Sequence, residues 1–218
     1  KEVATTFRAV EAGALAVLPR PPGLGHPDHE AMAQELIQTV KLMSEVKVVR
    51  RWARPRREGT APLRPPATAE VERRPKAAEI KLVAIGASTG GPIVLQTILA
   101  ALPKDFRVPV VIVQHMAAGF IPGFVEWLAQ TAGRPVHVAI HGETLLPGHV
   151  YVAPDGFQMK VERGAKVSLT HDEPENGLRP SLSYLFRSVA SAYGPNAVGV
   201  LHAGMGKEAA EEFSLIKE

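Results

Sequence analysis

Three residues suited to ester hydrolysis follow three separate apolar runs of the sequence. Ser88 lies in the GASTG stretch at 86–90, His115 follows the run at 108–113, and Glu208 follows a glycine-rich turn at 204–206. A serine hydroxyl becomes a good nucleophile when a neighbouring base takes its proton. An imidazole can take that proton, and an acid beside the ring fixes its tautomer and stabilises its charged form. These residue types are those of a Ser-His-acid site for acyl transfer.

The turn that carries Ser88 follows a short apolar run and precedes a helical pattern that starts at Pro92. It fits the G-x-S-x-G pattern of a nucleophile elbow, with glycines where a side chain would crowd. A Walker A loop is excluded because no G-K-[ST] closes the turn, and the dinucleotide fingerprint is missing because Ser88 replaces its second glycine. The remaining alternative is a serine that only caps the following helix.

Other residues in the sequence could also serve as the base or as the acid. The spacing from Ser88 to His115 is close to the roughly 30 residues of one βαβ unit, which predicts neighbouring parallel strands with both residues at the same sheet edge. His202 lies near the last turn and ranks below His115 as a base. Asp155 and Asp172 each follow a strand-like segment, so the residues alone leave them open as acids beside Glu208.

Alternating strand and helix patterns position these turns. Consecutive apolar residues predict buried strands of a parallel sheet at 82–85 and 108–113, and further strands are predicted at 136–139, 150–154 and 197–201. Helical spacing predicts helices at 92–102, 121–131 and 182–193, with Ser181 as the N-cap of the last one. Residues 158–162 and 166–169 flank a turn and predict a hairpin. The fold class is therefore α/β: a three-layer, doubly wound, mostly parallel sheet with an antiparallel hairpin.

The first 79 residues differ from the rest in pattern. Residues 1–50 predict a helix at 3–12, a short strand at 14–18 and a second helix from Asp28, whose apolar stripe at 37–46 we interpret as core packing. Residues 51–79 are rich in Pro and Arg and predict an extended linker. Residues 80–218 form the main domain, and we expect the chain to be a fragment cut at both ends.

Composition excludes several kinds of protein. The chain has 218 residues, of which 45% are hydrophobic and 22% charged, and it has no Cys, which excludes disulfides and thiolate sites. The net charge is only +3 and the basic excess lies in the linker, which argues against nucleic-acid binding. No metal-ligand spacing is present, and we expect no metal or other cofactor. Without a signal peptide or a membrane-spanning apolar run, we expect a cytoplasmic protein with no membrane insertion.

Several motifs in order resemble the CheB family of chemotaxis protein-glutamate methylesterases. They are GASTGG at 86–91, QHM at 114–116, LPGHVYVAP at 146–154, RPS at 179–181 and GMG at 204–206. This resemblance covers nearly all of residues 80–218. Residues 1–50 are similar to the C-terminal part of the response-regulator receiver domain that precedes this esterase domain in the family.

The resemblance implies hydrolysis of glutamyl methyl esters on methyl-accepting chemoreceptors to glutamate and methanol, with deamidation of receptor glutamines as a second activity. Ser88 would be the nucleophile, His115 the general base and Glu208 the acid. Backbone N–H groups of Thr89 and Met205 would form the oxyanion hole. A chemotaxis histidine kinase would be the phosphodonor to the full-length receiver domain, within a phosphorelay.

The sequence departs from the family at two of these positions. The family has Asp followed by Gly where this chain has Glu208 and Ala209, and the receiver usually has Lys where this chain has Arg20. Glutamate is one methylene longer than aspartate, and a misplacement of about 1 Å can cost roughly 100-fold in rate. The alternative function is therefore a catalytically weakened regulatory paralogue that binds receptors.

Overall fold

The computed structural model describes residues 2–14, 17–18, 20–45 and 79–202. The chain divides into two compact units. One unit holds Lys1–Arg20 and Glu79–Glu218, and the other holds Pro21–Ala78. All residues of the candidate site that the structure describes belong to the first unit.

A parallel sheet of five strands forms the centre of the larger unit, with the order β3-β4-β2-β1-β7. The strands are β1 (Leu82–Ala87), β2 (Val110–Gln114), β3 (Val136–Val138), β4 (Val150–Val152) and β7 (Ala197–His202). The central strands β1 and β2 are buried along nearly their whole length, as their unbroken apolar runs predict. All carboxyl ends therefore meet at one edge of the sheet.

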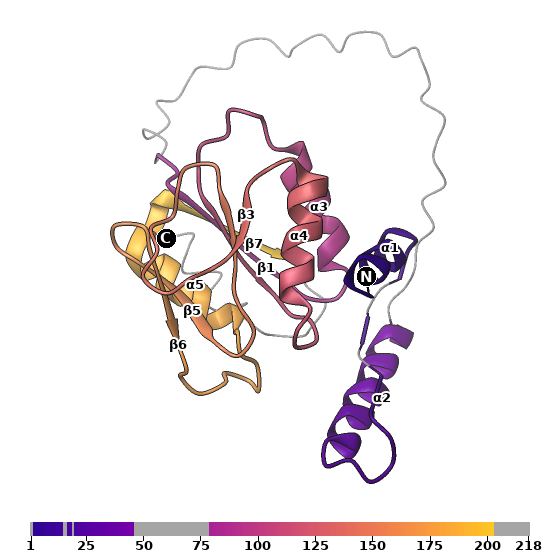
Figure 1. Ribbon diagram of the computed structural model, residues 1–218. Helices are drawn as coiled ribbons and strands as arrows, with labels where there is room; N and C mark the ends of the chain where they lie inside the picture. Colours follow the sequence, from indigo (N-terminus) through magenta and orange to yellow (C-terminus); the bar gives the residue numbers. More distant parts are fainter. Residues whose placement is uncertain (1, 15–16, 19, 46–78, 203–218) are drawn as a thin grey trace, which may run out of the picture. The chain divides into compact units, whose positions relative to one another are not determined.

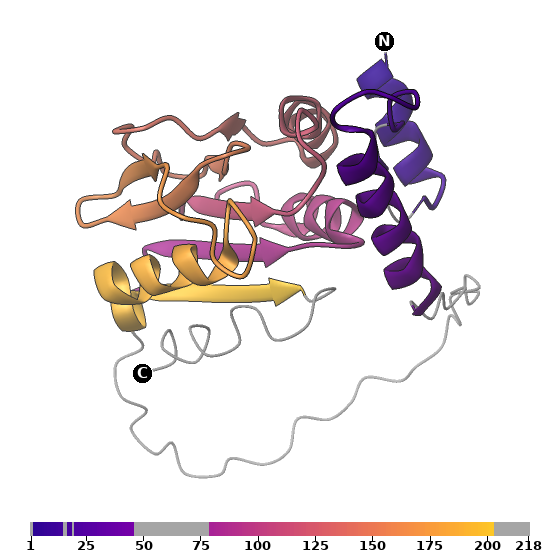
Figure 2. The same ribbon diagram turned by 90° about the horizontal axis from the view of Figure 1, so that it is seen from below.

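Two helices, α3 (Gly91–Ala101) and α4 (Ile121–Ala132), cover one face of this sheet. Figures 1 and 2 show them on the side opposite α5. Leu95 and Phe124 are fully buried against strand residues such as Ile112. The N-terminal helix α1 (Glu2–Glu11) adds to this layer, because the Phe7 ring stacks on that of Trp127 with 5.3 Å between centroids.

Helix α5 (Leu182–Tyr193) and a two-stranded antiparallel hairpin cover the other face. The hairpin consists of β5 (Gln158–Glu162) and β6 (Lys166–Thr170), and a short 3-10 helix, η1 (Gly194–Asn196), links α5 to β7. Ser181 caps α5 as predicted, since its side chain accepts a hydrogen bond from the backbone N–H of Tyr184. The three layers and the hairpin confirm the predicted fold class.

Helix α2 (His29–Glu45) belongs to the smaller unit. Ile37 and Val40 are 52% and 59% exposed, so the core packing predicted for their stripe is wrong for the described part of the chain. The reason is that no described segment of this unit covers that face of the helix. The strand predicted at 14–18 is also missing, because its described residues Ala14, Val17 and Leu18 have no strand conformation. The receiver origin of residues 1–50 stays a prediction, and of the linker at 51–79 only residue 79 is described.

Candidate active site

Ser88 is the first residue after β1, and its side chain is nearly buried, with 6% exposure. Its carbonyl accepts a hydrogen bond from the N–H of Gly91, which opens α3. Gly90, at the N-cap of α3, has φ 74°, a left-handed conformation that favours glycine. In this strand–turn–helix unit, the residue in the left-handed conformation is therefore Gly90 and not Ser88. In the described part of the chain, only Ala165 and Asn176 are non-glycine residues with positive φ, so Ser88 has no such strain.

The glycines on either side of Ser88 are required by close contacts. A Cβ atom at Gly86 would lie 2.3 Å from the Leu182 side chain of α5. At Gly91 it would lie 2.0 Å from Oε1 of Gln114. Both distances are below 3.0 Å, a separation that Cβ atoms essentially never have from non-bonded atoms. The crowding predicted from the glycine spacing is therefore confirmed.

His115 follows β2, the strand paired in parallel with β1. Its backbone N–H donates to the carbonyl of Ala87, at a distance of 3.0 Å. The buried amide of Gln114 donates through Nε2 to the carbonyls of both Ser88 and His115, each at 2.8 Å. These bonds join the two turns at the sheet edge. The neighbouring strands predicted from the spacing of Ser88 and His115 are therefore confirmed.

The imidazole of His115 contacts the segment that precedes α5. Its Nε2 lies 3.1 Å from the carbonyl oxygen of Pro180, which is buried. A carbonyl oxygen only accepts hydrogen bonds, so Nε2 carries the proton and Nδ1 is the nitrogen that can accept one. The tautomer of a neutral histidine is set in this way, by the hydrogen-bond partner of one ring nitrogen.

Both rival acids, Asp155 and Asp172, form hydrogen bonds with residues other than His115. Asp155 accepts a hydrogen bond from the backbone N–H of Gly119 at 2.8 Å. Asp172 accepts one from the Tyr184 hydroxyl, and this bond, with a smaller effect of Thr170, holds the pKa of the Asp172 carboxyl below its ordinary value. Neither contact involves His115.

The remaining predicted site residues are only partly within the described structure. Thr89 stands in the turn between β1 and α3. His202 ends β7, opposite Ala87 in the register, and a Cβ at Gly90 would lie 3.9 Å from its Nε2. His202 thus ends one of the two strands that flank β1, and His115 directly follows the other. Glu208 and Met205 lie outside the described residues.

Sequence reasoning missed the hydrogen bonds made by two buried amide side chains, Gln114 and Gln158. Gln114 was visible only as part of the QHM motif, without a role, and its signal was its place beside His115 at a buried strand end. Gln158 opens the hairpin and accepts a hydrogen bond from the N–H of Ser181 at 2.8 Å, and nothing in the sequence near it predicts this contact between residues 23 positions apart. Within the described segments, no three His, Asp or Glu side chains are close enough together to hold a metal ion.

Residues 83–218 match the protein family described as CheB methylesterase. The chain belongs to this family. The CheB methylesterase assignment rests on more than half of the chain, and it agrees with the strand–turn–helix unit at Ser88 and the parallel sheet around it.

Two curated relatives illustrate the similarity, and both are named protein-glutamate methylesterase/protein-glutamine glutaminase. That of Nitrosospira multiformis is 58% identical over 217 residues, covering 100% of this chain and 60% of its own length. That of Geobacter metallireducens is 58% identical over 220 residues, covering 100% of this chain and 61% of its own length. The chain thus spans about 60% of the length of these CheB relatives.

A solved structure shares the fold. The crystal structure of the Thermotoga maritima CheB methylesterase catalytic domain is 35% identical in sequence, with a TM-score of 0.60. The match covers 64% of this chain and 76% of that domain. The layered arrangement around the sheet is therefore that of a CheB catalytic domain.

Proposed function

We propose that this chain carries the catalytic part of a protein-glutamate methylesterase that acts on chemoreceptors. The observation that supports this most is the pair of turns at the sheet edge, where Gln114 bonds the carbonyls of Ser88 and His115. That arrangement brings a nearly buried serine and an imidazole to adjacent strand ends, which an acyl transfer requires. The names of the 58%-identical relatives supply the substrate class and add glutamine deamidation as a second activity.

The reaction follows the general logic of acyl transfer. The Ser88 hydroxyl attacks the ester carbonyl while Nδ1 of His115 takes its proton, and backbone N–H groups of Thr89 and Met205 hold the oxyanion. The tetrahedral intermediate then expels the methoxy group, which takes the proton from the imidazolium and leaves as methanol. Water, activated by the same imidazole, releases the glutamate carboxylate from Ser88. A carboxylate at Glu208 would stabilise the imidazolium in both steps.

The full-length protein with Ser88→Ala tests this proposal. Methanol release from methylated receptor membranes should fall on the order of a millionfold, below detection, because the nucleophile is gone. Ser168→Ala is a matched control, because Ser168 is also buried, with 7% exposure, but lies in the hairpin strand β6. Methanol release that survives in the Ser88→Ala protein would exclude Ser88 as the nucleophile.

A second candidate, a regulatory paralogue that binds receptors with little chemistry, is favoured by Glu208 and Ala209 in place of the Asp-Gly of the family. The variant Glu208→Asp separates the two. A large rise in turnover supports the weakened enzyme, whereas unchanged turnover shows that glutamate already serves as the acid.

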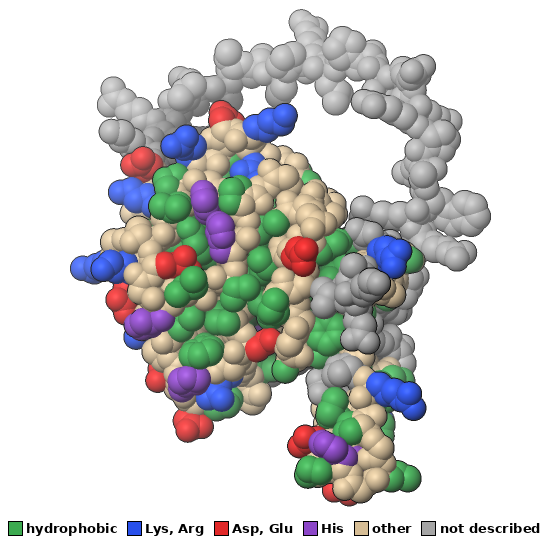
Figure 3. Space-filling view, viewed as in Figure 1, with side chains coloured by type: hydrophobic (Ala, Val, Ile, Leu, Met, Phe, Trp, Pro, Cys, Tyr) green, Lys and Arg blue, Asp and Glu red, His purple; other side chains and the backbone are tan. Residues whose placement is uncertain are grey.

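Membership of the CheB family also suggests a cellular compartment and partners for the proposed enzyme. We propose that it acts in the cytoplasm on methyl-accepting chemoreceptors and that a chemotaxis histidine kinase phosphorylates the receiver domain of the full-length protein. Among the described residues, no helix has the length and apolar character needed to cross a membrane. On the face that Figure 3 shows, the Lys and Arg side chains of the larger unit lie mainly along its upper left edge, with acidic side chains among them.

A further inference from the structure

We infer that Gln158 is a positioning residue for His115. It acts through the peptide group between Pro180 and Ser181. The inference rests on the proposed esterase function, and it names a residue on the hairpin, away from the strand ends that carry the nucleophile and the base.

A single peptide group connects the two side chains. Its N–H, from Ser181, donates to Oε1 of Gln158 at 2.8 Å. Its carbonyl, from Pro180, accepts from Nε2 of His115 at 3.1 Å. Because a peptide group is planar and rigid, fixing the direction of the N–H also fixes the direction of the carbonyl. The amide of Gln158 therefore determines where the acceptor for the imidazole lies.

Gln158 is well suited to hold this peptide group still. Its side chain has no exposed surface, and its Nε2 donates to the carbonyls of Glu173 at 3.1 Å and Leu178 at 3.4 Å. One buried amide thus binds the loop 171–181 at three backbone positions. A buried polar group with satisfied partners resists rearrangement, because any movement leaves donors or acceptors unpaired.

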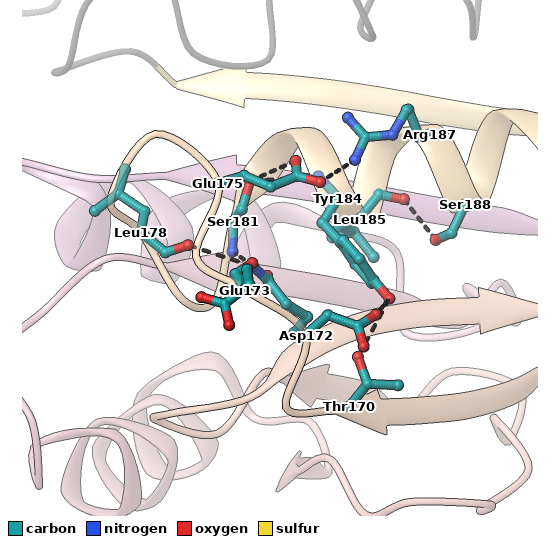
Figure 4. A network of polar contacts seen from close by, with 11 residues as sticks. Thr170, Asp172, Glu173, Glu175, Leu178, Ser181, Tyr184, Leu185, Arg187 and Ser188 are labelled. Atoms are coloured by element: carbon teal, nitrogen blue, oxygen red, sulfur yellow. Dashed lines mark hydrogen bonds and ion pairs between the residues drawn. The ribbon is translucent and has the colours of Figure 1, made fainter.

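The outer part of the same loop is held by exposed side chains (Figure 4). Asp172 bonds to Tyr184, and Glu175 forms an ion pair with Arg187 of α5. Exposed ion pairs contribute little free energy, so these contacts shape the loop without fixing the peptide group at its end. Glu175 also accepts a hydrogen bond from the Ser181 hydroxyl at 3.5 Å, but the amide of Gln158 is bonded to the N–H of the peptide group itself.

The consequence for His115 concerns its proton. With the Pro180 carbonyl fixed, the proton stays on Nε2, and Nδ1 remains the nitrogen that takes the proton of Ser88 in the proposed reaction. When the imidazole becomes positively charged, the hydrogen bond from Nε2 grows stronger, since charge-assisted bonds are stronger than neutral ones. The carbonyl therefore favours the charged intermediate that the reaction passes through.

The test uses the full-length protein with Gln158→Met, a change that keeps the side-chain length and removes all three hydrogen bonds. In 15N spectra of labelled histidine, His115 of the wild type should show a protonated Nε2, and the variant should show a mixture of tautomers. The kcat for methanol release should fall roughly tenfold to a hundredfold, as for a misplacement of about 1 Å. The KM should change little, because the side chain of Gln158 has no exposed surface for a substrate to contact.

The matched control is Ser188→Ala. Ser188 also links β5 to α5, since its hydroxyl accepts from the Val161 N–H at 3.1 Å and donates to the Leu185 carbonyl at 2.7 Å, but it does not touch the loop. It should lower the melting temperature and leave the His115 signal and kcat unchanged. If Gln158→Met fails to fold, the wild-type histidine spectrum still tests the inference, because it depends on a proton carried by Nε2 of His115.

Two results would overturn the inference. One is a wild-type His115 that carries its proton on Nδ1. The other is a folded Gln158→Met protein whose His115 signal and kcat match those of Ser188→Ala. Absence of Ser88-dependent methanol release in the wild type would instead overturn the proposed function, and the histidine spectra would still decide the role of Gln158.

Discussion

The side chain of Gln114 both hydrogen-bonds the turns at the sheet edge and packs against Gly91. Its Nε2 bonds the carbonyls that follow β1 and β2, while its Oε1 lies against the space that the missing side chain of Gly91 leaves free. Oε1 has no hydrogen-bond partner within the described residues, so the amide is held by its two donor bonds and by packing. Any group added at residue 91 must therefore displace the amide that joins the Ser88 and His115 turns.

We expect Gly91→Ala to impair methanol release more than it impairs folding. The new Cβ would lie 2.0 Å from Oε1 of Gln114 and 2.9 Å from Cβ of Ala87, and both neighbours are buried. Overpacking of this kind costs roughly 1–3 kcal/mol of unfolding free energy, although alanine is the better helix former. Urea denaturation and a methanol assay of the same sample measure the two effects.

Gly23→Ala serves as the control for this change, because a Cβ there meets nothing within 4 Å and the backbone φ is not positive. It should leave both unfolding and turnover close to the wild type. Wild-type turnover in the Gly91→Ala protein would show that the Gln114 bridge has no role in placing the two turns.

Helix α5 and strand β6 hold the loop 171–181 through a pair of groups whose bond depends on pH. The hydrogen bond from Tyr184, followed by that of Thr170, lowers the pKa of Asp172 below its ordinary value of 3.8. Burial, followed by the bond to Asp172, raises the pKa of Tyr184 above its ordinary value of 10.0. The stabilisation from this contact is therefore fully present between the two ordinary pKa values, 3.8 and 10.0. It is lost as the pH falls through the lowered pKa of Asp172. It is also lost as the pH rises through the raised pKa of Tyr184.

Tyr184→Phe should therefore destabilise the protein at pH 7 and have a smaller effect at pH 3. Phenylalanine keeps the ring and removes only the hydroxyl that Asp172 accepts from. Urea denaturation of wild type and variant at both pH values gives the comparison, and Tyr193→Phe, on the same helix but bonded to neither residue, controls for loss of a hydroxyl. An equal difference at pH 3 and pH 7 would contradict the assigned pair.

The elements of the larger unit were predictable because their signals are local. The unbroken apolar run of β1 and the capping Ser181 of α5 each depend on neighbouring residues, and both were confirmed. The bond from His115 to Pro180 was not predictable, because its partners are 65 residues apart and meet only after the sheet and hairpin have packed. The exposure of Ile37 in α2 was also not predictable, because an apolar stripe on a helix does not show whether another segment packs against it.

At the scale of the whole molecule, the N-terminal helix α1 packs as part of the larger unit. Phe7 is 3% exposed, and its ring lies 5.3 Å from that of Trp127 and 6.0 Å from that of Phe124. These three rings extend the core layer formed by α3 and α4. Residues before the linker therefore contribute to the stability of the unit that carries Ser88.

Phe7→Ala should lower the unfolding free energy of this unit by roughly 3–5 kcal/mol, the usual cost of removing a buried aromatic ring. Urea denaturation followed by tryptophan fluorescence measures the loss, because Trp127 lies against the deleted ring. Val40→Ala, at a side chain with 59% exposure in α2, should change the same transition by less than about 0.5 kcal/mol. If hydrogen exchange instead showed α1 opening alone while the sheet kept wild-type protection, α1 would be a separate docking helix and the three-ring cluster would not belong to the cooperative core.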